Sequence, residues 1–72
     1  MSIKSEKFVI LAEKRVNNAI KQLELVGNLS NKSSYEYTEQ QAKKIIGVLK
    51  ETLKSTEQKF NDEINGKKKF KL

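Results

Sequence analysis

Two long stretches of this chain repeat apolar residues at the three- and four-residue spacing of an α-helix, and a polar stretch separates them. With Val9 at heptad position a, the a and d positions of the first stretch are all apolar: Val9, Ala12, Val16, Ala19, Leu23 and Val26. This repeat predicts an amphipathic helix over about residues 5–26. Its a positions are large and its d positions mostly small, which lets a facing helix approach closely.

The second stretch predicts a helix over about residues 39–65, whose apolar positions are Ala42, Ile46, Leu49, Leu53, Thr56 and Phe60. Thr38 and Gln41 have the spacing of a capping box, in which each side chain bonds the backbone N–H of the other residue. Opposite charges four residues apart, Glu39 with Lys43 and Lys59 with Glu63, predict ion pairs along the helix surface. Gly66 is expected to stop the helix.

Between the helices, residues 27–38 are predicted to form a polar joint. Gly27 or Asn28 is expected to end the first helix in the left-handed conformation. Two interpretations of the joint remain open. In the structural one, Tyr35 and Tyr37 form a lid over the end of a helical core and the asparagines form turns. In the functional one, the joint is a recognition loop that presents Asn28, Asn31, Tyr35 and Tyr37 to a partner.

The predicted fold class is all-α: an antiparallel two-helix hairpin, coiled-coil-like, in a single domain of residues 1–65, with a basic flexible tail at residues 66–72. A core of this size rarely supplies more than about 3–5 kcal/mol. The chain has no Cys and no His, so disulfides and the usual zinc sites are excluded. We therefore expect a homo-oligomer, such as a dimeric four-helix bundle, or docking on a larger protein.

Apolar residues beside the first repeat predict a surface for that partner. The candidate protein-binding residues there are Phe8, Leu11, Arg15 and Leu25, in addition to the four residues of the joint. The alternative is that these apolar side chains complete the core of a homodimer.

The formal net charge of +6 raises the question of nucleic-acid binding. Most of that charge lies in residues 66–72, and the rest of the chain is nearly neutral. Lysines recurring every seven residues opposite the apolar repeat are typical of a solvated helix face. The competing hypothesis is a nucleic-acid surface that would use Lys7, Lys14, Arg15, Asn18, Lys21, Lys67, Lys68, Lys69 and Lys71. In architecture, such a dimeric hairpin would resemble the Rop type of RNA-binding bundle.

Catalytic chemistry is not expected, because the chain lacks a Cys nucleophile, a His base, a Gly-rich phosphate loop and a carboxylate cluster with metal spacing. We accordingly predict no catalytic residue, no metal, no cofactor and no small-molecule substrate. No apolar run approaches the roughly 18 residues that indicate a membrane span. With no export signal recognised either, the expected location is the cytoplasm.

The segments Arg15-Val-Asn17, Leu23-Glu-Leu-Val-Gly-Asn-Leu-Ser-Asn31 and Tyr35-Glu-Tyr-Thr38 carry a resemblance. The chain is similar, over roughly Phe8–Phe60, to a family of short, mostly uncharacterised bacterial two-helix proteins, some carried on mobile elements. The basic tail does not belong to that pattern. The resemblance implies that the joint matters and supplies no mechanism. Together these features predict an interaction module, either an accessory subunit or a modulator of a larger bacterial complex of mobile-element or phage type.

Overall fold

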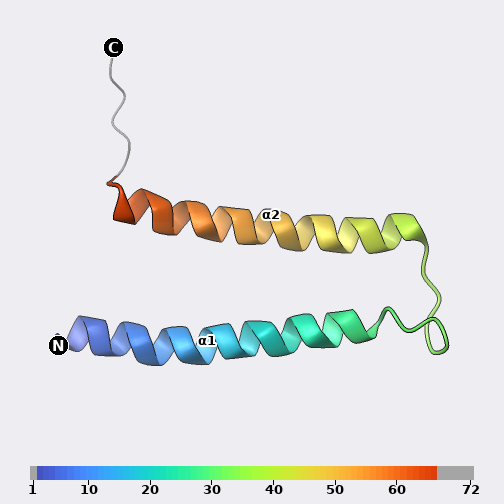
Figure 1. Cartoon of the computed structure of the whole chain (residues 1–72), viewed down its shortest axis with the longest axis horizontal. Helices are drawn as coiled ribbons and strands as arrows, with labels where there is room; N and C mark the ends of the chain where they lie inside the picture. The colour runs from blue at the N-terminus through green and yellow to red at the C-terminus, as the bar shows by residue number, and fades with distance from the viewer. Residues whose placement is uncertain (1, 67–72) are drawn as a thin grey trace, which may run out of the picture. The chain divides into compact units, whose positions relative to one another are not determined.

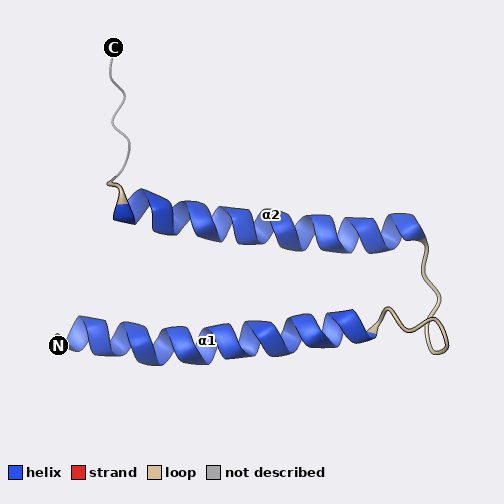
Figure 2. Cartoon of the chain, in the orientation of Figure 1, coloured by secondary structure: helices blue, strands red, loops and turns tan. Residues whose placement is uncertain are grey.

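The computed structural model describes residues 2–66, and these residues form two α-helices and no strand. Helix α1 is Ile3–Asn28 and helix α2 is Glu39–Ile64 (Figures 1 and 2). The all-α class predicted from the apolar periodicity is confirmed, and two helices with a short connection fit a helical hairpin. The chain divides into two units, Met1–Glu36 around α1 and Tyr37–Leu72 around α2, which are described separately below.

Helix α1 begins at Ile3, ahead of the start predicted near Ser5, because Ser2 caps it. The Ser2 side chain accepts a hydrogen bond of 3.1 Å from the backbone N–H of Ser5. The Ser5 hydroxyl in turn donates to the Ser2 carbonyl over 2.9 Å. A serine that satisfies a free N–H of the first turn is a favourable helix start, so the helix gains its extra residues at this end.

The end of α1 differs from the prediction of a left-handed residue at Gly27 or Asn28. Both residues are helical, and Gly66 alone has a positive φ within residues 2–66. The final turn instead tightens: the N–H of Leu29 donates to the Val26 carbonyl and that of Ser30 to the Gly27 carbonyl, each over 3.0 Å. Such three-residue bonds satisfy the last carbonyls without a left-handed residue. The prediction was wrong for that reason.

Residues 29–38 connect the helices, and Asn31 organises the first part of this connection. Its side-chain Oδ1 accepts from the backbone N–H of Ser33 over 2.9 Å. Its carbonyl accepts from the N–H groups of Ser34 and Tyr35, over 3.1 and 3.0 Å. An asparagine that bonds the backbone two residues ahead is a common turn former, so the predicted role of an asparagine in the turn is confirmed at Asn31.

Helix α2 has the predicted start and stop. Thr38 is its N-cap, and Asn65 is the C-cap, followed by Gly66 with a φ of 70°. That left-handed conformation costs glycine little and other residues more, so Gly66 ends the helix as expected. The predicted ion pair between Glu39 and Lys43 forms at 3.0 Å. The pair predicted between Lys59 and Glu63 does not form within the described part of the chain.

None of the residues from 2 to 66 is fully buried. The half-buried ones are small or apolar, apart from Ser5 and Tyr37: Leu11, Ala12, Val26, Ala42 and Leu49. Each helix therefore exposes its apolar side chains to solvent in this structure, and those side chains form the candidate site.

Candidate interaction surfaces

Helix α1 carries a continuous apolar stripe, whose central line we call the α1 seam: Ser5, Val9, Ala12, Val16, Ala19, Leu23 and Val26. Ser5 is the one polar member of this set. Phe8 borders the seam on one side and Ile20 on the other, so the stripe covers about 120° of the helix circumference at 3.6 residues per turn. Its larger residues are about half exposed, for example Val16 at 55% and Leu23 at 49%. A stripe wider than about 100° is typical of a helix that packs in a multi-helix core, since a two-helix coiled coil needs only a narrow seam.

The charged residues of α1 are sorted to opposite sides of this stripe. Its acids, Glu6, Glu13 and Glu24, all lie beyond Ile20, and we call them the acidic edge. The basic residues lie on the other side and on the back of the helix: Lys4, Lys7, Lys14, Arg15 and Lys21. The acidic edge was not among the predicted site residues, although its spacing in the sequence already places it on one side. Charges that border an apolar stripe select partner and orientation.

Helix α2 carries a similar stripe along the α2 seam: Ala42, Ile46, Leu49, Leu53, Thr56 and Phe60. Leu53 is 69% exposed, the most of the large residues in either seam. The one hydroxyl in the seam is satisfied inside the helix, because Thr56 Oγ1 donates to the Thr52 carbonyl over 2.9 Å. A facing helix would therefore meet an apolar surface with no unpaired polar group at Thr56.

One edge of the α2 stripe is rich in lysine. Lys43, Lys50 and Lys54 lie there together with Glu39 and Glu57. Beside them the surface is slightly hollowed next to Gly47, where an added Cβ would meet no atom within 4 Å. This depression is shallow and open, bordered by Ala42, Lys43, Ile46 and Lys50, so it offers no enclosed binding site.

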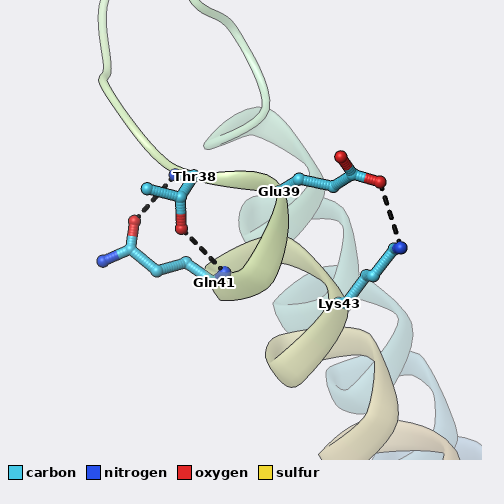
Figure 3. A network of polar contacts seen from close by, with 4 residues as sticks. All are labelled: Thr38, Glu39, Gln41 and Lys43. Atoms are coloured by element: carbon cyan, nitrogen blue, oxygen red, sulfur yellow. Dashed lines mark hydrogen bonds and ion pairs between the residues drawn. The ribbon is translucent and has the colours of Figure 1, made fainter.

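The start of α2 is held by a complete capping box (Figure 3). The N–H of Gln41 donates to Thr38 Oγ1 over 3.0 Å, and the N–H of Thr38 donates to Gln41 Oε1 over 2.8 Å. Lys43 reaches back toward Glu39 on the next turn (Figure 3). This network of short-range bonds sets where α2 begins and therefore which of its residues form the seam.

The structure separates the residues predicted as one protein-binding flank of α1. Phe8 and Arg15 border the seam, whereas Leu25 lies on the lysine-bearing back of the helix and is 51% exposed. Leu11 is half-buried and lies between these two groups, apart from both. Only Phe8 and Arg15 therefore belong with the apolar stripe.

The predicted residues of the joint are placed differently from one another. Asn28 lies in the last turn of α1, and Asn31 uses its side-chain oxygen in the turn that follows. Tyr35 is 50% exposed and Tyr37 is half-buried beside the N-cap of α2. For Asn31, this local bond supports the structural interpretation. The lid and recognition-loop interpretations of the two tyrosines both stay predictions.

The residues predicted for nucleic-acid binding fall into two groups. Lys7, Lys14, Arg15, Asn18 and Lys21 are all exposed and lie on the side of α1 away from the acidic edge. Lys67, Lys68, Lys69 and Lys71 lie outside the described residues. The described group forms a convex helix surface without an interleaved aromatic residue.

Within residues 2–66, neither helix is long and apolar enough to cross a membrane, and no cluster of three His, Cys, Asp or Glu residues could hold a metal ion. No protein-family model, curated protein or solved structure matches the chain.

Proposed function

We propose that this protein is a non-enzymatic interaction module whose apolar stripes on α1 and α2 assemble with a second copy or dock on a larger protein. The observation that carries the proposal is that both helices have a continuous apolar stripe and none of the described residues is buried. Apolar stripes of this extent on the helices of a small chain are typical of association surfaces.

The free energy at stake supports association. Fully burying one large aliphatic or aromatic side chain contributes about 1.5–3 kcal/mol, and the two seams together expose several such residues, among them Val16, Leu23, Leu53 and Phe60. A lone core in a chain of this length supplies only about 3–5 kcal/mol. Covering both stripes with a second protein surface is therefore the stronger source of stability.

As a biological setting, we propose an accessory subunit or modulator of a larger bacterial complex, of mobile-element or phage type. Its support is the resemblance of the joint and its flanking helices to short bacterial two-helix proteins. A small hairpin with no reactive site acts through the surface that it covers on its partner.

The mass of the protein in solution tests the proposal. We expect the wild-type chain to have a mass above that of the 8.3 kDa monomer or to be captured by a larger protein of its host, and Leu53→Glu to abolish that association because it places a charge in the α2 seam. The matched control is Val48→Glu, which makes the same charge change at a 58% exposed apolar residue outside the seam. A helical monomer that captures no partner, or equal effects of the two variants, contradicts the proposal.

A second candidate function is binding of RNA by the basic side of α1. It is favoured by one observation, the exposure of Lys7, Lys14, Arg15 and Lys21 on the side away from the acidic edge. Neutralising Lys7, Lys14 and Lys21 to Gln should then lower the slope of log affinity against log salt by about 2–3. Affinity for RNA that does not change with salt contradicts this candidate.

A further inference from the structure

Large and small residues alternate along both seams in a way that suits one particular pairing. In α1 the small residues Ser5, Ala12 and Ala19 alternate with larger ones, and in α2 the large residues Ile46, Leu53 and Phe60 alternate with Ala42, Leu49 and Thr56. Well-packed cores set large side chains against small ones across facing positions. Two helices with this pattern match best when the small positions of one face the large positions of the other.

Parallel pairing of like helices does not achieve this match. It places each heptad position opposite itself, so Ala12 would face Ala12 and Leu53 would face Leu53, and layers of void would alternate with layers of crowding. Voids and overpacking both cost stability. Antiparallel pairing sets position a against position d and matches large with small in every combination of α1 and α2, so size alone leaves three antiparallel pairings.

Charge decides among those three. In an antiparallel pair of two α1 helices with matched sizes, Glu13 lies opposite its own copy near the centre, and so does Arg15. In the corresponding pair of two α2 helices, Lys50 lies opposite its own copy. Like charges set against each other across an interface disfavour that pairing. When α1 pairs with α2, the acidic edge meets the lysine-rich edge and Glu13 lies beside Lys50.

From this complementarity, which rests on the proposed function and specifies its partner, we infer that α1 packs against α2 of a second copy of the chain. The helices are antiparallel, in the register in which Ala12 faces Leu53 and Ala19 faces Ile46. The stripe on α1 is about 120° wide, more than one neighbouring helix covers. A neighbour from a second copy supplies the missing cover, and its charges identify it as α2.

One contact in this register is unfavourable and makes the inference more specific. Next to the layer of Ser5 and Phe60, Glu6 comes to lie opposite Glu57 on the same edge. Both side chains are exposed, so their repulsion is weak and screened by salt. Removing it should strengthen the dimer: Glu57→Lys is expected to lower the dimer dissociation constant severalfold.

Charge reversal at the centre of the pair is the main test, with the dissociation constant measured by analytical ultracentrifugation and helicity by circular dichroism. Glu13→Lys and Lys50→Glu should each raise the dissociation constant about tenfold, since a symmetric dimer loses two attractive contacts worth up to about 1 kcal/mol each. The double variant Glu13→Lys/Lys50→Glu should return it to near the wild-type value. Glu51→Lys is the control, because it makes the same charge change on the side of α2 away from its seam.

The outcomes separate this inference from the function on which it rests. Full helicity with weakened single variants and a restored double variant supports the pairing. A dimer that ignores Glu13→Lys, or a double variant as weak as the two single changes combined, overturns the pairing and leaves an association module in place. A helical chain that is monomeric at all concentrations overturns the pairing, and if it also captures no partner it overturns the proposed function.

Discussion

Removal of the Thr38 hydroxyl tests whether the connection controls the stability of α2. In Thr38→Ala the backbone N–H of Gln41 loses the acceptor that lies 3.0 Å away, while the bond from the Thr38 N–H to Gln41 Oε1 can persist. The change leaves the charge and both apolar seams as they are. Its effect therefore isolates one cap bond.

The magnitude follows from the position of that bond. Replacing a Thr, Ser, Asp or Asn N-cap by Ala costs typically about 1 kcal/mol, within about 0.5–2 kcal/mol. For a chain of 60–100 residues a loss of 1 kcal/mol lowers the Tm by about 4–8 °C. We expect Gln41→Ala to cost less, because it leaves the Thr38 hydroxyl bonded to the backbone. The double variant should lose less than the two single changes combined, since the two bonds support each other.

Thermal unfolding followed by circular dichroism measures these losses on the full chain at a stated protein concentration, because association raises apparent stability. Thr38→Ser is the matched control: it keeps an oxygen at the same place and should retain most of the wild-type Tm. The reasoning is refuted if Thr38→Ala and Thr38→Ser unfold at the same temperature.

Two further changes on α2 have opposite expected results. Gly47→Ala should raise the free energy of unfolding by about 1 kcal/mol, because Gly47 lies inside a helix and an added Cβ meets no atom within 4 Å; urea titration measures this, and a loss of stability would show that a partner approaches closely there. Lys43→Ala should change the same free energy by less than about 0.5 kcal/mol, since Lys43 and its ion-pair partner Glu39 are 75% and 81% exposed. A larger loss, measured at low salt and abolished at high salt, would place Lys43 in an interface.

Much of the candidate site could be predicted from the order of residues alone. The members of both seams follow from the helical period, and the charge of each edge follows from where Glu13, Arg15 and Lys50 fall on it. The grouping of Leu25 with Phe8 failed for a physical reason. Apolar character at a position does not say which neighbours share its side of the helix, and Leu25 lies among lysines.

By itself, the sequence determined the two helices, their amphipathic stripes, the capping box at Thr38 and Gln41 and the stop at Gly66, because each depends on residues within one or two turns of each other. The structure alone decided how α1 ends. Gly27 and Asn28 can adopt a left-handed cap or stay helical, and the two outcomes differ by little free energy. The bonds from Leu29 and Ser30 to the last carbonyls, followed by the turn at Asn31, stabilise the helical outcome. A choice between such similar states is made by the complete set of hydrogen bonds in the folded connection.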